Sequence, residues 1–341
     1  MKRFFSLILV FVLMLCLISC KPDGSEKTDD PTVEIARNMA VYHNTVFYYD
    51  SRTQTIKYQN IDHIYSTGVP LYQDALASGD ENPFVEMIQP KIIVDPIATE
   101  KNGGHPVLYI YYRKQLKTFL VSFNTANNQV RILKEDISPV MTLFLYGEHL
   151  IFSTAEGDAG EVIHTVKTDG TDFCTLENPD KLLMRPRNVL NDRIYFTSTG
   201  NLYTAPLSLD SSSLVLSDCD TPVFFGGEDI YYVESSTSHL CKVSPDDPSS
   251  KETVIQENTG GMAWGSLYLY LIGKPEDQNT FYLYNAQTNE NKIIYQNPDP
   301  NFRRGHVCFS DTYICFQGST DEGKRIFYYD LVKQEEIEIP Y

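Results

Sequence analysis

The stretch NDRIYFTSTGNLY, residues 191–203, contains the pattern that decides the fold. A polar pair at 191–192 precedes the alternating run RIYF at 193–196, and a second turn at 200–201 precedes Leu-Tyr at 202–203. Polar or glycine-containing pairs between β-branched and aromatic runs are typical of β-hairpins. The segment therefore predicts consecutive antiparallel strands joined by tight turns.

The same pattern recurs along the whole chain. Its turns are His43-Asn44, Gly103-Gly104, Gly147-Glu148, Asn191-Asp192, Gly226-Gly227, Gly265-Ser266 and Asp311-Thr312, each just before an aromatic and β-branched run. From the second turn to the seventh, the spacing averages about 41 residues, which matches the ~40–50 residues of four-stranded propeller blades. A second hairpin in each unit, such as 162–176, supplies the other two strands. The expected fold class is all-β: a β-propeller of four-stranded antiparallel blades. A β-sandwich would not explain the period.

The number of blades depends on the first unit. The interval from His43 to Gly103 is longer than the later ones, which predicts an insertion near residues 63–90, rich in glycine, proline and charge. Residues near 36–72 either form a complete first blade, giving seven blades, or complete the last one, giving six. Because the C-terminal unit already contains strand-like runs through Pro340-Tyr341, we favour seven blades within a propeller domain at 35–341.

The N-terminus has the features of an export signal. Lys2 and Arg3 precede a mostly apolar stretch from Phe4 to Ile18, and Ser19-Cys20 follows. The apolar stretch is shorter than the ~20 residues that a membrane-spanning helix requires. We therefore assign 1–19 to a signal peptide. Residues 20–34 are charged and contain proline and glycine, which predicts a flexible tether.

Residues 17–20, Leu-Ile-Ser-Cys, resemble the lipobox of bacterial lipoproteins. The resemblance implies that Cys20 becomes the acylated N-terminus of the mature chain, carrying palmitate or a similar acyl group. It also implies an exported protein, lipid-anchored to the cell membrane or the outer membrane and facing outside the cytoplasm. An ordinary secretory signal with a chance cysteine is the alternative, because Cys16 shows that cysteine also occurs inside the apolar stretch.

The repeats themselves resemble a group of bacterial propeller lipoproteins of the TolB-like class, related in repeat style to the low-density-lipoprotein-receptor propeller. The resemblance rests on the lipobox, the tether and repeats such as 192–196 with 200–203. It implies the propeller fold and the envelope location far more than any activity.

Charge limits the partners. The chain has 45 Asp and Glu against 28 Lys and Arg, a net charge of −17. Nucleic acid and anionic lipid headgroups would repel such a surface, so neither is an expected partner. Anchoring must therefore depend on the lipid, and stable anchoring takes more than one acyl chain. We expect a monomer.

Catalytic propellers place their reactive residues where the innermost strands begin. Those strands are expected to start near Arg37, Lys91, Met141, Arg185, Asp220, Gly260 and Arg303. A glycosidase needs two carboxyl groups ~5–10 Å apart, and these positions contain no such pattern. HExxH, GxSxG and Walker motifs are also absent from the sequence. We therefore expect no catalytic residues, no metal and no cofactor.

The predicted role is a non-catalytic recognition or scaffold module for a protein, peptide or glycan; the alternative is a glycan hydrolase or lyase with an axial active site.

Basic residues gather at several of these strand starts despite the acidic composition. They predict an anion-binding mouth formed by Arg37, Lys91, Arg185, Arg187, Arg303 and Arg304, where arginine can hold a carboxylate with two hydrogen bonds. The alternative is that loops are simply charged, since acidic residues fall on the same face.

Cys308 and Cys315 should lie opposite each other across the turn at 311–312; the sequence leaves open whether they form a disulfide.

Overall fold

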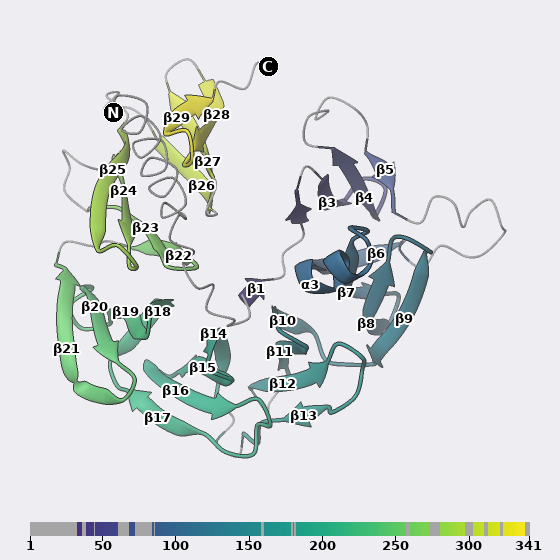
Figure 1. Ribbon diagram of the computed structural model, residues 1–341, viewed down its shortest axis with the longest axis horizontal. Helices are drawn as coiled ribbons and strands as arrows, with labels where there is room; N and C mark the ends of the chain where they lie inside the picture. The colour runs from purple at the N-terminus through teal and green to yellow at the C-terminus, as the bar shows by residue number, and fades with distance from the viewer. Residues whose placement is uncertain are drawn as a thin grey trace, which may run out of the picture. The chain divides into compact units, whose positions relative to one another are not determined.

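Seven antiparallel β-sheets follow one another along the chain. The innermost strands of successive sheets contact each other, and Figure 1 shows the sheets arranged around a common axis. The seven-bladed β-propeller predicted from the repeats is confirmed. The structure is a computed structural model and describes residues 33–337 except 36–38, 44, 61–67, 72–83, 85, 158–159, 179, 181, 257–259, 273–279, 297–302, 310–312 and 321–322.

Each blade runs from an innermost to an outermost strand in chain order. Blade 1 contains β2 (Met39–Tyr42), β3 (Thr45–Asp50), β4 (Thr55–Asn60) and β5 (Val69–Pro70); blade 2 contains β6 (Met87–Asp95), β7 (Val107–Lys114), β8 (Lys117–Asn124) and β9 (Gln129–Glu135). Blade 3 contains β10 (Val140–Tyr146), β11 (His149–Ala155), β12 (Glu161–Lys167) and β13 (Cys174–Thr175); blade 4 contains β14 (Arg185–Leu190), β15 (Arg193–Ser198), β16 (Asn201–Pro206) and β17 (Ser213–Leu216). Blade 5 contains β18 (Cys219–Gly226), β19 (Asp229–Glu234), β20 (Leu240–Ser244) and β21 (Asp247–Ile255); blade 6 contains β22 (Gly261–Trp264), β23 (Leu267–Tyr270), β24 (Thr280–Asn285) and β25 (Glu290–Gln296). Blade 7 contains β26 (Arg303–Phe309), β27 (Tyr313–Thr320), β28 (Gly323–Asp330) and β29 (Glu335–Ile337).

The recurring aromatic residues form the core between blades. Phe224 of blade 5 stacks on Tyr231 of its own blade at 5.2 Å between ring centroids and on Tyr268 of blade 6 at 5.5 Å. Tyr268 in turn stacks on Tyr270 at 5.5 Å. These rings are buried, so the aromatic residues that mark the repeat in the sequence are the ones that join neighbouring blades.

The innermost strand has a β-bulge near its start in at least five blades. The register with the second strand shifts between Ile88 and Lys91, Val140 and Thr142, Pro186 and Asn188, Asp220 and Val223, and Arg304 and Val307. A bulge adds unpaired backbone and redirects the side chains that it contains. We call the face at which the innermost strands begin the entry face, and the opposite face, with turns such as Gly147-Glu148, the turn face. The bulges therefore collect near the entry face.

One additional strand, β1 (Val33–Ile35), lies on the axial side of blade 3. It pairs with β10, which makes this sheet five-stranded. Residues 33 and 34, assigned from the sequence to the end of the flexible tether, belong instead to this strand. The reason is that Val33 and Ile35 alternate with a charged residue, as strand residues do, and the inner edge of β10 offers unpaired backbone groups to them.

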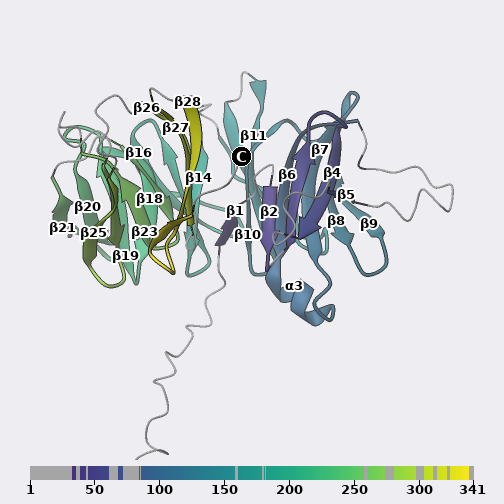
Figure 2. The ribbon, with the colours of Figure 1, turned by 90° about the horizontal axis from the view of Figure 1, so that it is seen from above.

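The first two blades differ from the expectation in two places. Instead of a tight turn at Gly103-Gly104 alone, β6 and β7 are joined by helix α3 (Pro96–Lys101), which Asp95 caps by accepting a hydrogen bond from the Ala98 amide at 2.8 Å. Figure 2 shows α3 on the turn face. The expected insertion at 63–90 also contributes to the blades, because it includes β5 and the start of β6.

Within the described part of the chain, no helix has the length and hydrophobicity needed to cross a membrane.

Candidate functional site

The entry face of blades 2 to 4 brings predicted basic residues into one sector. Arg185 is the first residue of β14, Arg187 lies in the β14 bulge, and Lys91 follows the β6 bulge. The innermost strands of these three blades are in contact, with β10 between β6 and β14. Of the other predicted residues, Arg303 and Arg304 begin β26 in blade 7, and their side chains lie outside the described residues, as does all of Arg37.

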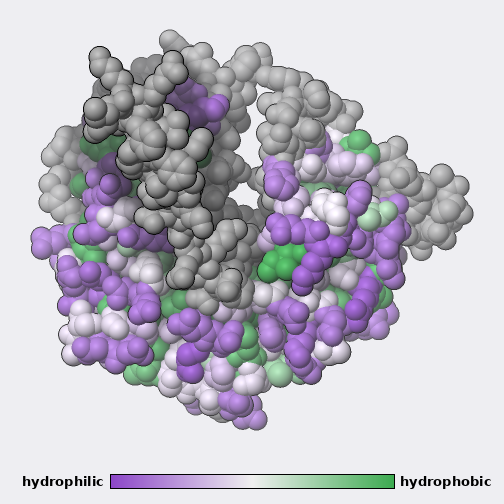
Figure 3. Space-filling model, viewed as in Figure 1, coloured by the Kyte–Doolittle hydropathy of each residue, from purple (hydrophilic) through white to green (hydrophobic). Residues whose placement is uncertain are grey.

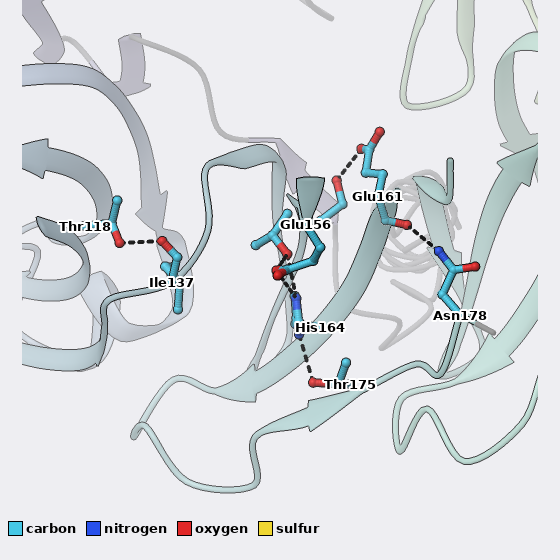
Figure 4. A network of polar contacts seen from close by, with 9 residues as sticks. Thr118, Ile137, Glu156, Glu161, His164, Thr175 and Asn178 are labelled. Carbon is cyan, nitrogen blue, oxygen red and sulfur yellow. Dashed lines mark hydrogen bonds and ion pairs between the residues drawn. The ribbon is translucent and has the colours of Figure 1, made fainter. Parts of the chain in front are cut away.

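Arg185 is held by a buried glutamate that the sequence analysis did not identify. Its Nε lies 3.1 Å from Oε2 of Glu161, a residue that is only 3% exposed. The Ser153 hydroxyl donates to the other carboxylate oxygen at 2.7 Å. Figure 4 shows Glu161 within the polar network of blade 3. Because one carboxylate already neutralises Arg185, this arginine contributes less to anion binding than its position in the sequence predicts.

Arg187 is in a different situation. Its Nε donates to the Thr197 hydroxyl at 2.8 Å, and the side chain is half-buried. Burial lowers the pKa of the guanidinium and the neighbouring Arg185 lowers it further, while Glu161, Cys219 and Asp220 oppose the shift. No carboxylate lies within ion-pair distance of Arg187 among the residues that the structure describes. A guanidinium has five N–H donors, so Arg187 retains donors for an anionic ligand.

Lys91 is a second partly buried cation on the entry face. Burial lowers the pKa of its ammonium group, and the described part of the chain offers it no ion-pair partner. Taking a cation out of water without a counter-charge is unfavourable. An anion bound beside Lys91 would remove that cost.

Large apolar side chains are exposed in the same sector. Ile88 lies directly before the β6 bulge, Met141 in the β10 bulge, and Leu183 just before β14, and each is about half exposed. The pairing of Leu183 with Glu161 places it beside the Arg185 ion pair. We call the surface formed by Lys91, Arg187, Ile88, Met141 and Leu183 the basic–apolar sector. From the sequence, Met141 could be placed only near a strand start, and nothing local in the sequence marked Ile88 or Leu183 as exposed, because their exposure depends on the strand register and on the pairing of Leu183 with Glu161.

His164, in the third strand of blade 3, has a structural role. The ring nitrogens of His164 bond to the hydroxyls of Thr154 at 2.7 Å and Thr175 at 2.9 Å, as Figure 4 shows. Its ring also stacks on Phe173, with 5.4 Å between ring centroids. Both nitrogens are therefore engaged within the blade. Among the described residues there is also no group of three His, Cys, Asp or Glu side chains that could hold a metal ion.

The environment of His164 gives a testable pH dependence. Burial lowers its pKa below the ordinary value of 6.5, with Glu156 opposing and Lys134 adding to the shift. As the pH falls below 6.5, the unfolded chain binds a proton at this histidine before the folded chain does, so the free energy of unfolding should decrease. Urea unfolding at about pH 7.5 and about pH 5.5 should show this decrease, and His164→Gln should reduce it. Burial also lowers the pKa of His149, so His149→Gln measures the contribution of that second histidine to the same decrease. A pH dependence unchanged by His164→Gln would contradict this assignment.

The cysteines of the described part do not form a nucleophilic site. Cys174, Cys219 and Cys241 are free thiols, and burial raises the pKa of Cys219 to about 12, which keeps it protonated. Cys308 pairs directly with Cys315 in the β26–β27 register, as expected from the turn at 311–312. Their side chains lie outside the described residues, so the structure does not test the disulfide that the sequence left open.

Comparisons with known proteins agree on the fold. No protein-family model matches the chain, and no curated protein matches it. Among solved structures, an oligogalacturonate lyase in complex with manganese aligns with a TM-score of 0.52 and 10% identity over 87% of this chain and 90% of that one. Porphyromonas gingivalis dipeptidyl peptidase 4 aligns with a TM-score of 0.52 and 12% identity over 89% of this chain and 52% of that one. An uncharacterized protein from Listeria monocytogenes EGD-e aligns with a TM-score of 0.50 and 10% identity over 68% of this chain and 78% of that one. These neighbours are β-propeller proteins, and at such identities the similarity extends to the fold alone.

Proposed function

We propose that the chain is an exported lipoprotein, anchored through acyl groups on Cys20, whose propeller is a non-catalytic recognition module. The signal-like residues 1–19 and the lipobox-like residues 17–20 support the anchor. The propeller fold supports recognition, because innermost strands from several blades expose side chains on one face. The ligand would be held outside the cytoplasm, close to the membrane.

The ligand we propose is an acidic polypeptide segment with apolar residues. The observation that carries this proposal is the basic–apolar sector, where two partly buried cations without a carboxylate partner in the described chain lie among exposed aliphatic residues. Arginine and lysine would pair with Asp or Glu of the ligand, and Ile88, Met141 and Leu183 would cover its apolar side chains. A glycan is the less favoured ligand, because sugar rings pack best on exposed aromatic rings, and these three side chains are aliphatic.

The charged groups of this sector favour binding over hydrolysis. Glycoside hydrolysis needs a pair of carboxyl groups, one of them free to donate a proton. Glu161 is the buried carboxylate that pairs with Leu183 beside the sector, and its two oxygens are engaged by Ser153 and Arg185. This arrangement suits a residue that orients Arg185 and supports the assignment of a non-catalytic role.

Binding to designed peptides tests the proposal. The soluble chain from residue 21 onward would be titrated into labelled peptides that alternate Asp or Glu with Leu or Phe, and binding followed by fluorescence anisotropy. Peptides with Asn and Gln in place of Asp and Glu, and polygalacturonate as an acidic glycan, serve as comparison ligands. We expect the acidic peptides to bind and their affinity to fall with salt, because the contacts are charged.

Two arginines with the same kind of hydrogen bond provide the control, although Arg193 is exposed and Arg187 is half-buried. Arg187 and Arg193 each donate Nε to a threonine hydroxyl, at 2.8 Å and 3.2 Å, but Arg193 begins β15 at the turn face. Arg187→Glu should weaken acidic-peptide binding by about 10- to 100-fold, the effect of losing a charged hydrogen bond of ~1.5–3 kcal/mol. Arg193→Glu should leave it unchanged. Equal losses in both variants, or binding to polygalacturonate alone, would overturn the peptide proposal.

A further inference from the structure

The direction of β1 determines the face at which the chain enters the propeller. β1 is antiparallel to β10, with Val33 beside Tyr146 and Ile35 beside Phe144. β10 begins at the entry face with Val140 and ends at Tyr146, just before the Gly147-Glu148 turn. Val33, the first residue of the compact unit, therefore lies at the turn-face end of β10, and the chain runs from there toward the entry face.

Without β1, the chain would enter from the other side. β2 is the innermost strand of blade 1 and begins at Met39 on the entry face, as β10 does at Val140. A tether joined directly to β2 would leave the propeller beside the bulges and the basic–apolar sector. By pairing along the axial side of β10, β1 moves the point of exit to the opposite face.

We infer that β1 routes the N-terminal segment along the propeller axis, so that the anchored protein holds its turn face toward the membrane and its entry face away from it. This inference rests on the proposed anchor at Cys20. Residues 21–32 could extend over about 40 Å at ~3.3 Å per residue, so attachment biases the orientation instead of fixing it rigidly. Figure 3 shows the turn face, and hydrophilic residues predominate over the part of it that is coloured. This face therefore lies near the membrane without inserting into it, and the basic–apolar sector stays accessible to partners.

The other end of the chain offers an internal control. Glu335 of β29 pairs with Asp330 next to the β28–β29 turn, and β29 then runs to Ile337, paired with Tyr328. β29 therefore leads from the turn face toward the entry face. An anchor placed after the C-terminus should hold the protein in the opposite orientation.

Energy transfer to a membrane dye measures the orientation. Two tagged proteins are needed. In the first, a decahistidine tag replaces residues 1–20; in the second, residues 1–20 are removed and the tag follows residue 341. Each tag binds vesicles of phosphatidylcholine that contain a nickel-chelating lipid. A fluorescent amino acid would replace either Leu116, 96% exposed in the β7–β8 turn of the entry face, or Val332, 74% exposed in the β28–β29 turn of the turn face. With the N-terminal tag we expect severalfold more transfer to a headgroup acceptor from Val332 than from Leu116. With the C-terminal tag we expect the reverse.

A variant of β1 tests its role directly. Replacing Val33, Glu34 and Ile35 by Gly, Ser and Gly should abolish or reverse the difference between Leu116 and Val332 in the N-terminally tagged protein, because the chain would then leave from the entry face at β2. Circular dichroism and thermal melting would confirm that the propeller is folded. Equal transfer from both positions in the unmodified chain, or a difference that survives the β1 replacement, would overturn the inference. Because the tag replaces the lipid, a failure of Cys20 acylation would disprove the proposed anchor and leave this measurement unaffected.

Discussion

Replacing Cys20 by alanine is expected to remove all acyl label from the chain. Cells grown with an alkyne-tagged palmitate analogue should label the unmodified protein, and the label should disappear in Cys20→Ala. The physical reason is that acylation needs the cysteine thiol, and the tether that follows Cys20 contains nothing apolar that could replace the lipid. In-gel fluorescence after immunoprecipitation gives the measurement.

Cys16 is the matched control. It lies four residues earlier in the apolar stretch, so Cys16→Ala should keep the full label if Cys20 is the modified residue. Since an uncleaved signal could hold the Cys20→Ala chain at the membrane, a further form would carry a standard cleavable secretory signal directly before Lys21. That form should appear in the soluble fraction. Persistent label in Cys20→Ala, or loss of label in Cys16→Ala, would contradict the lipobox assignment.

Truncating Tyr268 should cause one of the largest losses of stability available in this chain. Its side chain is fully buried at the contact between blades 5 and 6, where it stacks on Phe224 and Tyr270. Removing a large buried aromatic side chain leaves a cavity, and such changes cost about 3–5 kcal/mol in the free energy of unfolding. Tyr268→Ala should therefore lower the melting temperature by several degrees or more, measured by differential scanning calorimetry.

Two further variants show whether the loss comes from this contact. Ile293 is 56% exposed on the outermost strand of the same blade, so Ile293→Ala should change the melting temperature little. Gly261 lies against the Tyr268 ring, and a Cβ there would come within 2.5 Å of it. Gly261→Ala should therefore also destabilise the protein. Comparable melting temperatures for Tyr268→Ala and Ile293→Ala would refute the interblade role of Tyr268.

The repeats predicted the blades well because the signals are local. The pair Asn191-Asp192 and the run at 193–196 appear in the structure as a tight turn and β15, and Arg185 and Arg303 are the first residues of their innermost strands, as expected. Lys91 is the exception. Its strand begins four residues earlier, at Met87, because the bulge between Ile88 and Lys91 interrupts the alternation that marks a strand.

The candidate site was less predictable because its contacts are not local. Arg185 could be placed at a strand start, but its partner Glu161 belongs to the third strand of the preceding blade. Only the pairing between strands and the packing between blades bring these residues together. β1 was missed for the same reason: a three-residue strand has almost no sequence signal, and its partner β10 lies more than a hundred residues further along the chain.

The bulges also have an evolutionary consequence. Each bulge lies within one blade, and the buried aromatic residues that join the blades lie outside the bulges: Phe224 is in the regularly paired part of β18 just after its bulge, and Tyr268 is in β23. A mutation or short insertion at one bulge can therefore alter one contact with a ligand while the packing between blades persists. Paralogues of such a protein could acquire new partners one blade at a time, with little risk to folding at each step.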